Sequence, residues 1–372
     1  MTDSMKSAKV FSKKFGIKGK IVANEPFGGG IINNTYLMTT KHWGVTKRYV
    51  CQMINTNVFK DVDGMMGNIT RVTKHIKNKL IAEGKDPARL VLSFLETKDG
   101  TPYFVDDNGK YWRGYEFIPD SVTYDATKDP KVLYSTGWAF GHFQIQLADF
   151  DASTTVETIP NFHNTRSRYA DFKEAVKNDI AGRADSVKDE IAFILSKEEQ
   201  ACKLVDMLHE GKLPVRVTHN DTKSNNVLFD NETNEPIAVI DLDTVMPGLA
   251  AYDFADSIRF AANTAAEDEP DESKVHLDLT LFEAYANGFI SQVAKALTED
   301  EILTLADAVV SIAAEQCTRF LGDYLNGDTY FKVKRPGQNL DRTHCQMALL
   351  RDAEAKLPEM RKIVEKVYEA NK

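Results

Sequence analysis

The sequence predicts an α+β fold of two lobes, a β-rich N-terminal lobe with one long helix and a larger, mainly helical C-terminal lobe. Short β-prone runs separated by turn residues dominate roughly the first hundred residues. From Pro130 onward the apolar residues recur with a helical period instead. The composition changes at Pro119, Asp120 and Ser121, so we place the boundary there and expect lobes at 1–118 and 119–372.

The N-terminal lobe is predicted to contain five strands and one helix. The strands are expected at 20–27, 31–40, 47–54, 89–95 and 110–118. A glycine run at 28–30 joins the first two as a hairpin, and the turn sequence D-D-N-G at 106–109 precedes the last. Over 61–83 apolar residues recur at three- and four-residue steps, which predicts an amphipathic helix. These residues are Val62, Met65, Met66, Ile69, Val72, Ile76 and Leu80.

The C-terminal lobe is predicted to be mostly helical, with a polar loop between short strands. Helices are expected at 130–148, 168–182, 187–210, 278–296, 299–325 and 343–370. Short strands are expected at 214–218, 226–230 and 236–241.

Charge and cysteine content limit the possible partners and location. The 372-residue chain has a formal net charge of −9, which disfavours nucleic acid and anionic membranes but allows ATP at a local cationic or metal site. The basic N-terminus lacks the apolar region of a secretory signal, and no window approaches the roughly 20 apolar residues that span a bilayer. The four cysteines lie far apart without a CxxC pair, which favours reduced thiols in the cytoplasm.

The polar loop carries an aspartate and, five residues later, an asparagine. Asp221 can accept or orient a hydroxyl proton, and Asn226 can turn its amide oxygen toward a magnesium ion. Their spacing is that of a kinase catalytic loop. We expect His219 to brace this loop by hydrogen bonding. Alternatively, the Thr-His-Asn-Asp sequence is only a hydrogen-bonded turn, because Asn and Asp are common turn residues.

A second acidic motif follows the apolar run at 237–240. Asp241 at the end of this strand is well placed as a fixed magnesium ligand, since Mg²⁺ prefers a few carboxylates together with phosphate oxygens. The two motifs together favour phosphoryl transfer over a simple turn. Asp243 could bind a second metal or brace the loop. We expect Asp253 and Asp256 to cap a helix and anchor the loop.

These motifs define the fold class more closely. A β-rich lobe with one helix, followed by a helical lobe with such a loop, is a bilobal protein-kinase-like fold. In that setting the glycine run at 28–30 is interpreted as a flap over the phosphates, because backbone N–H groups can approach a ligand where no Cβ intervenes. A plain turn is the alternative. The cofactors implied are ATP and Mg²⁺.

Two long segments resemble a known superfamily. VTHNDTKSNNVLFD (217–230) and IAVIDLDTVMPGLAAYDFADSIRF (237–260) are similar to the aminoglycoside phosphotransferases and choline kinase-like enzymes. A wider likeness, including EPFGGGIINNTYL (25–37) and RFLGDYLNGDTYF (319–331), resembles the N-acetylhexosamine 1-kinases. The resemblance implies transfer of phosphate from ATP to the anomeric hydroxyl of N-acetylglucosamine or N-acetylgalactosamine. We expect the protein to be a cytoplasmic monomer.

The resemblance also implies roles for individual residues, with Asp221 as the catalytic base. The implied magnesium ligands are Asn226 and Asp241, and the implied sugar contacts are Thr244, Arg319 and Tyr330. We add Asp243 as a candidate metal ligand and Asp221 as a sugar contact. We expect the nucleotide contacts to be Gly28, Gly29, Gly30, Asn33, Gln52, Tyr115, Phe117 and Lys223. Arg319 could instead form a salt bridge within the helical lobe, and Tyr330 could be a core or interface aromatic.

The sequence departs from the kinase pattern at two places. Protein kinases pair a third-strand lysine with a glutamate on the next helix, but here the strand offers Gln52 and the helix has no glutamate. We expect the metals and a nearby cation such as Lys223 to neutralise the phosphates. Ile31 occupies a flap position where the hexosamine kinases are more polar.

Two alternative functions remain open at this point. The acceptor could be another alcohol, such as choline, an aminoglycoside, homoserine or methylthioribose. A cationic acceptor would need an acidic pocket, which the acidic run at 267–272 could offer, although a solvated loop is the favoured interpretation. Gln52 also allows a nucleotide-binding pseudokinase without turnover, although the base and metal ligands are intact.

Overall fold

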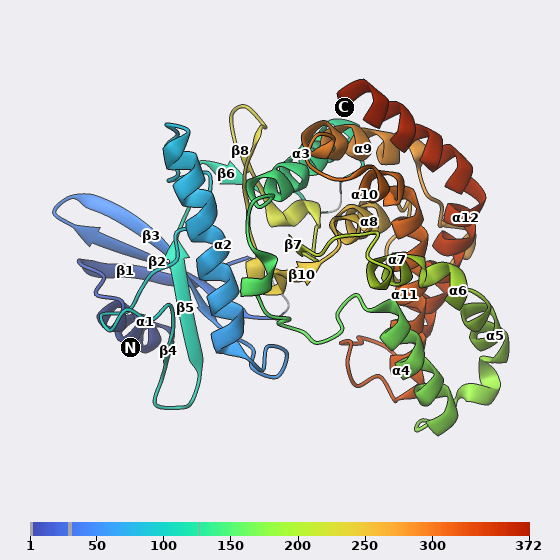
Figure 1. Cartoon of the computed structure of the whole chain (residues 1–372). Helices are drawn as coiled ribbons and strands as arrows, with labels where there is room; N and C mark the ends of the chain where they lie inside the picture. The colour runs from blue at the N-terminus through green and yellow to red at the C-terminus, as the bar shows by residue number, and fades with distance from the viewer. Residues whose placement is uncertain (1–2, 29–31, 126) are drawn as a thin grey trace. The chain divides into compact units, whose positions relative to one another are not determined.

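The computed structural model describes residues 3–28, 32–125 and 127–372 (Figure 1). It is an α+β protein with a sheet-rich N-terminal part and a helical C-terminal part, as the sequence predicts. Contacts group the chain into two compact units. The first unit comprises Met1–Val122, Ser153–Ile159 and Phe229–Val245, and the second comprises Thr123–Ala152, Pro160–Leu228 and Met246–Lys372. Two segments beyond residue 119 therefore group with the sheet, and a functional boundary at 119 stays a prediction.

Within the described residues, the first unit is built on a five-stranded antiparallel sheet in the order β1-β2-β3-β5-β4. The strands are β1 (Lys20–Pro26), β2 (Asn34–His42), β3 (Val45–Met53), β4 (Phe104–Val105) and β5 (Tyr111–Glu116). The β2–β3 hairpin turns at Trp43 and Gly44, whose φ angles of 48° and 81° suit a two-residue turn that follows the twist of the sheet. Four of the five predicted strands are thus confirmed.

The strand predicted at 89–95 is wrong. Among the described residues of this segment, Phe94 alone forms a β-bridge, with Tyr115. The preceding residues form a turn, because the carboxylate of Asp86 and the carbonyl of Pro87 accept backbone hydrogen bonds from the residues that follow them. The remaining strand of the sheet is β4, whose two residues are too few to give a periodic signal.

Two helices belong to the first unit. Helix α1 (Asp3–Lys14) was not predicted, although Ala8, Phe11 and the following Phe15 recur at helical spacing and pack into one buried cluster with residues of the sheet. The many lysines around them obscure this short apolar stripe. Helix α2 (Val62–Ala82) confirms the predicted helix, and its apolar face is buried.

A small three-stranded sheet explains why a distant segment groups with the first unit. It has the order β6-β8-β9 and consists of β6 (Ser121–Val122), β8 (Val227–Asp230) and β9 (Pro236–Val239). Phe229 and Asp230 pair with β6. The chain from this pairing to Val245 therefore packs within the first unit.

The second unit contains ten of the described helices and a two-stranded sheet of β7 (Arg216–Thr218) and β10 (Met246–Gly248). The helices are α3 (Pro130–Gln146), α4 (Thr165–Asn178), α5 (Lys188–Ser196), α6 (Glu198–Ala201), α7 (Lys203–His209), α8 (Ala250–Ala261), α9 (Leu279–Val293), α10 (Glu299–Leu303), α11 (Leu305–Leu325) and α12 (Gln338–Asn371). Helix α11 is buried along almost its whole length, and it contacts α4, α8 and α12.

Two predicted helices are broken. The segment predicted at 187–210 forms three helices, and the one at 299–325 forms two. At the first break in 187–210 and at the break in 299–325, a side-chain hydroxyl bonds to the backbone of the preceding turn: Ser196 donates to the Phe193 carbonyl and Thr304 to the Asp300 carbonyl. Such bonds compete with the helical ladder, and apolar periodicity cannot reveal them.

Helices α3 and α9 pack closely because glycines line their contact. An added Cβ at Gly288 would overlap the Tyr134 carbonyl, and one at Gly137 would overlap the Tyr285 carbonyl. Gly322, on α11, differs from them. Its Cβ would lie 3.8 Å from the Phe172 ring, which is an ordinary contact.

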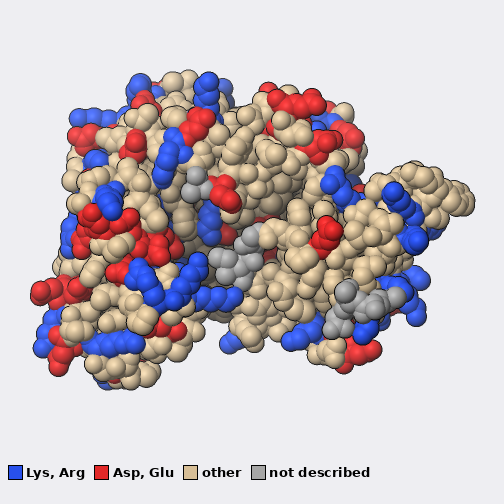
Figure 2. All heavy atoms as spheres, turned by 180° about the vertical axis from the view of Figure 1, so that it is seen from behind, with Lys and Arg blue, Asp and Glu red and all other residues tan. Residues whose placement is uncertain are grey.

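The surface of the described residues carries both signs of charge. Figure 2 shows Lys and Arg side chains interspersed with Asp and Glu on the face that it presents. Among the described residues, no helix combines the length and the apolar character needed to cross a bilayer.

Two glycine substitutions test the helix packing. Gly288→Ala should lower the free energy of unfolding by about 1–3 kcal/mol, because the methyl group forces α3 and α9 apart. Gly322→Ala should leave it unchanged or raise it by up to about 1 kcal/mol, because alanine favours a helix and meets no clash. Urea unfolding of both variants measures the difference, and equal midpoints would contradict the packing argument.

Candidate active site

A buried carboxylate of α8 holds the polar loop that follows β7. The side chain of Asp253 accepts hydrogen bonds from the backbone N–H groups of His219 (2.9 Å) and Asn220 (2.7 Å), and from Nε2 of Gln144 (2.8 Å). The Thr222 hydroxyl donates to the Asp253 carbonyl. Burial raises the pKa of Asp253, while His219 and the N–H donors act in the opposite direction. The predicted anchoring role of Asp253 is confirmed.

The capping role predicted for Asp253 and Asp256 is wrong. The N-cap residue of α8 is Leu249, and both aspartates lie inside the helix. Asp256 lies 3.2 Å from the Arg259 guanidinium on its own helix. A further loop anchor is Ser257, whose hydroxyl donates to the backbone carbonyl at position 222. Sequence reasoning missed it because an isolated serine gives no signal.

Three of the predicted site residues meet in this loop. The Lys223 ammonium lies 2.8 Å from Oδ1 of Asp221, and Nδ2 of Asn226 donates to Oδ2 (3.1 Å) and to the backbone carbonyl (2.7 Å) of the same aspartate. His219 accepts from the Asp221 backbone N–H through Nδ1, which confirms its bracing role. Burial alone would raise the pKa of Asp221, but Lys223 and these hydrogen bonds lower it below its ordinary value. The carboxylate is therefore ionised at neutral pH.

The second acidic motif forms a tight turn within the first unit. Asp241 has φ 59°, in the left-handed region that few residues other than glycine adopt, and a short 3₁₀ helix (Leu242–Thr244) follows it. Thr158 donates to the Asp243 carbonyl, and Asn68 of α2 donates to the carbonyl of Val245, the residue that ends the turn. The surrounding structure therefore holds an unfavourable backbone conformation in place.

The predicted magnesium ligands are chemically suited to that ion. They are two carboxylates and an amide oxygen, and Mg²⁺ prefers few protein oxygens with phosphate oxygens and water completing its shell. In the part of the chain that the structure describes, no three His, Cys, Asp or Glu side chains gather as a metal site. Asn226 lies in the second unit, whereas Asp241 and Asp243 lie in the first, so the magnesium site stays a prediction.

Most of the predicted nucleotide contacts lie in the first unit. Gly28 has φ 75°, whereas Gly29, Gly30 and Ile31 lie outside the described residues. The other predicted nucleotide contacts of the first unit have neighbours within it. Asn33 donates to Asp243 (2.7 Å), and Gln52 donates to Thr35 (3.3 Å). The Tyr115 ring lies 5.2 Å from the Phe94 ring, and the Phe117 ring faces the Arg48 guanidinium at 4.1 Å. Their contacts to a nucleotide stay predictions.

Arg319 lies on α11 between two aromatic rings. Its guanidinium is 5.3 Å from the centre of the Phe162 ring and 5.5 Å from that of Phe331. Its Nη1 donates weakly to Gln316 at 3.4 Å. No carboxylate among the described residues lies within ion-pair distance, so the alternative of a salt bridge in the helical lobe is not observed.

The loop before α12 presents Tyr330 to solvent. Its side chain is 62% exposed, which excludes the core alternative. The buried Asp323 carboxylate holds the loop by accepting from the backbone N–H groups of Thr329, Tyr330 and Phe331. Thr244 lies in the acidic turn of the first unit. The sugar contacts proposed for these residues stay predictions.

The acidic run at 267–272 is largely neutralised by its neighbours. Glu267 pairs with Arg259 at 2.7 Å, Glu269 with Lys274 at 3.3 Å, and Glu272 with Arg351 at 3.1 Å. This pattern supports the structural interpretation of the run over an acidic pocket.

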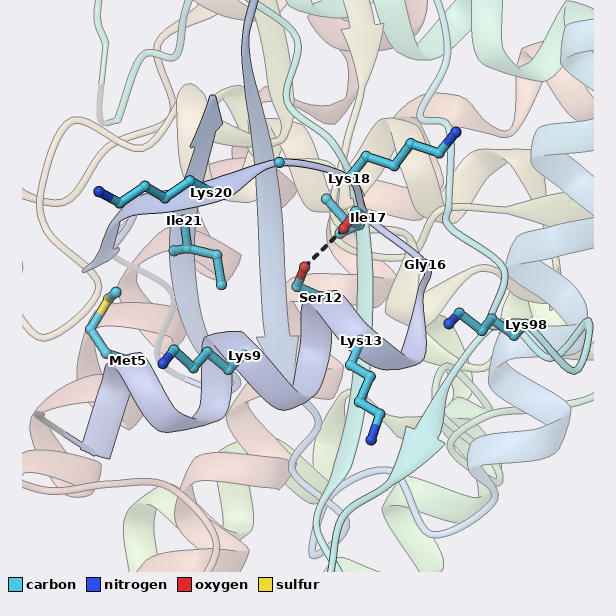
Figure 3. A pocket seen from close by; sticks show the side chains of 11 residues that line it. Met5, Lys9, Ser12, Lys13, Gly16, Ile17, Lys18, Lys20, Ile21 and Lys98 are labelled. Atoms are coloured by element: carbon cyan, nitrogen blue, oxygen red, sulfur yellow. Dashed lines mark hydrogen bonds between the residues drawn. The ribbon is translucent and has the colours of Figure 1, made fainter. Parts of the chain in front are cut away.

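A hollow of about 810 Å³ lies elsewhere in the first unit, at the end of α1 and the start of β1 (Figure 3). Its lining includes the exposed lysines Lys9, Lys13, Lys18, Lys20 and Lys98. None of the predicted site residues lines it, so we assign it no part in the chemistry.

The ion pair of Asp221 and Lys223 can be tested by titration. In Lys223→Met the Asp221 carboxyl should titrate at higher pH, because the cation that stabilises its charged form is gone. Carboxyl ¹³C NMR measures this, with Asp221→Asn to identify the signal. Lys188→Met removes an exposed ion pair with Asp185 and serves as the control. An unchanged titration in Lys223→Met would contradict the role of the ammonium.

Known phosphotransferases resemble this chain in sequence and in fold. The model of the phosphotransferase enzyme family matches residues 24–287. The structure is similar to a microcompartment-associated aminopropanol kinase (TM-score 0.61, 13% identity, 96% of this chain and 98% of that one). It is also similar to an aminoglycoside phosphotransferase from Alicyclobacillus acidocaldarius (TM-score 0.60, 14% identity, 96% and 95%). A spectinomycin phosphotransferase solved with ADP and spectinomycin gives a TM-score of 0.53 at 13% identity (93% and 98%).

These likenesses to solved structures, which extend over nearly the whole chain, show a kinase-like fold. The family match covers more than half of the chain, and it includes both the loop with Asp221 and the turn with Asp241. The chain belongs to the phosphotransferase enzyme family.

Proposed function

We propose that this phosphotransferase transfers the γ-phosphate of ATP to the anomeric hydroxyl of N-acetylglucosamine or N-acetylgalactosamine. The observation that carries the proposal is the Asp221 carboxylate, ionised and oriented by Lys223 and Asn226 on an anchored loop. The sugar is proposed from the likeness of the sequence to N-acetylhexosamine 1-kinases. We also propose that the protein acts as a cytoplasmic monomer.

Asp221 would orient the acceptor hydroxyl and receive its proton. A carboxylate whose pKa is lowered is a weak base, so its main contribution is to hold the hydroxyl in line with the phosphoryl group. Phosphoryl transfer demands mostly positioning and charge stabilisation, which suits this arrangement. Lys223, already paired with the carboxylate, would place its positive charge near the transferred group.

Asn226, Asp241 and Asp243 would hold magnesium, which would neutralise the charge on the phosphates. The glycine run at 28–30 would cover the nucleotide, together with Asn33 and Gln52. The aromatic side chains Tyr115 and Phe117 would contact the base. An ADP complex has been solved for the spectinomycin phosphotransferase, and we propose an adenine nucleotide here as well.

The surroundings of Arg319 favour a neutral acceptor over a cationic one. Its guanidinium has no ion-pair partner among the described residues, and burial together with Arg319 lowers the pKa of the nearby Arg168. Guanidinium groups can donate hydrogen bonds to sugar hydroxyls and to an acetamide carbonyl, whereas an ammonium cannot accept them. The buried Glu315 carboxylate offsets part of their positive charge. The neutralised acidic run at 267–272 also offers little attraction for a cation.

Two alternatives remain. The family also includes kinases of other small alcohols, and the chain is similar in fold to an aminopropanol kinase. A pseudokinase would bind nucleotide without turnover. Against it, Asp221, Asn226 and Asp241 are all present, and the loop that carries the base is firmly anchored.

An acceptor panel tests the function. With ATP and Mg²⁺, ADP release should be fastest with N-acetylglucosamine or N-acetylgalactosamine and much slower with choline, ethanolamine, aminopropanol or spectinomycin. NMR of the product should show phosphate on C1. Phosphate on C6, or preference for an amine, would refute the proposed substrate, and nucleotide binding without ADP release in the whole panel would favour the pseudokinase.

The base is tested by Asp221→Asn. The amide cannot accept the proton, so kcat should fall by roughly 10²–10⁴-fold while the KM for ATP changes little. Asp185→Asn alters an exposed aspartate of the second unit and should retain full activity. Activity near that of the wild type in Asp221→Asn would exclude its role as base.

A further inference from the structure

Arg113 is a buried cation in the first unit that the sequence did not single out. It lies on β5, and only 2% of its surface is exposed. A guanidinium removed from water in this way must be compensated by its neighbours. Its partners therefore show which parts of the unit depend on it.

The partners of Arg113 come from three separate elements. Nε donates to Oε1 of Gln52 on β3 (3.0 Å), Nη2 lies 2.5 Å from Oδ1 of Asp243 in the acidic turn, and Nη1 lies 3.7 Å from Sδ of Met66 on α2. Oδ1 of Asp243 accepts no hydrogen bond of ordinary geometry from the described residues, so its contact with Arg113 is one of charge.

This arrangement accounts for the missing lysine on β3. Gln52 and Arg113 are directly opposite each other on neighbouring strands. A lysine at position 52 would place a second cation against the guanidinium, and like charges at paired positions are unfavourable. The glutamate expected on α2 is also unnecessary, because Met66 faces Arg113 there and Asp243 supplies the carboxylate.

The same carboxylate also reaches the segment that follows the glycine run. Oδ2 of Asp243 accepts from Nδ2 of Asn33 at 2.7 Å, and Oδ1 of Asn33 accepts from the Asn55 backbone N–H at 2.9 Å. The Arg113–Asp243 pair thus joins β5, the residues after β3 and the end of the glycine-rich connection. All of these residues belong to the first unit.

We propose that Arg113 is a positioning residue for the proposed phosphotransfer and takes the place of the third-strand lysine. It holds Asp243, and through it the strained turn at Asp241, in the conformation that binds magnesium with the nucleotide. The inference rests on the proposed function, because it assigns Asp241 to the metal. Arg113 itself is enclosed by its partners and does not contact the phosphates.

Nucleotide binding by Arg113→Met tests this role. Calorimetry compares the affinity for ADP with Mg²⁺ and with EDTA. The affinity with Mg²⁺ should fall about 10–100-fold, as for other residues that orient metal ligands, while the affinity in EDTA stays unchanged. Arg113→Lys keeps the positive charge without the planar guanidinium and should give an intermediate loss of affinity with Mg²⁺. Arg89→Met removes an ion pair to Asp230 elsewhere in the unit and should match the wild type.

The possible outcomes are distinguishable. An unchanged Mg²⁺ affinity in folded Arg113→Met would overturn the inference, and an equal loss with and without Mg²⁺ would show direct contact with the nucleotide instead. If Arg113→Met does not fold, Arg113→Lys decides by the same comparison. A wild-type protein that binds no nucleotide would overturn the proposed function, and this inference with it.

A second measurement needs neither nucleotide nor substrate. Gln52→Lys should lower the thermal midpoint of the wild type, because it sets two cations side by side on β3 and β5. In the Arg113→Met background, Gln52→Lys should lower the thermal midpoint much less, because the opposing charge is gone. Equal effects in both backgrounds would refute the claim that Arg113 excludes a lysine from position 52.

Discussion

A charge that is removed from water must be compensated, and this requirement shapes the parts of the molecule that carry chemistry. Asp253 is completely buried, and its carboxylate is satisfied mainly by backbone N–H groups of the loop that holds Asp221. The need to satisfy this charge therefore dictates the shape of the loop. Asp243 plays the corresponding part in the first unit, where Arg113 and Asn33 compensate it.

Asp253 and Asp243 both hold segments in which one residue has an uncommon, left-handed backbone conformation. Asn220 and Asp241 have φ angles of 63° and 59°, which the polypeptide adopts reluctantly. The Asn220 N–H donates to the Asp253 carboxylate, and Asp243, whose carboxylate accepts from Asn33, follows Asp241 in the acidic turn. Phosphoryl transfer depends on groups that are already oriented before the substrate arrives, and this kind of anchoring supplies such order.

The second unit holds a cation between two aromatic rings and an anchored loop close to it in the sequence. Arg319 lies between Phe162 and Phe331, and Asp323 fixes the loop that presents Tyr330. We propose that this setting suits a sugar, because aromatic faces and hydrogen-bond donors can both contact it. The charges near the acceptor, rather than the shared fold, should separate the acceptor classes of such enzymes.

Much of the fold and the catalytic loop could be predicted from local pattern. The apolar period of α2 depends on residues close in the chain, and the structure confirms this helix. The spacing of Asp221 and Asn226 is equally local, and the two side chains meet in the polar loop, while their catalytic roles stay predictions. The predictions that failed rest on short or mixed patterns. The strand predicted at 89–95 is wrong because a turn begins at Pro87, and helix α1 was not predicted because lysines surround its few apolar residues.

The sequence by itself determined the α+β class and the family, because each resides in contiguous residues with a recognisable pattern. Only the tertiary structure decided what compensates the buried charges. Asp243 lies 130 positions after Arg113 in the chain, and Asp253 lies 34 after His219, yet each meets its partner in space. Such pairs form when packing excludes water, and no periodicity along the chain records them.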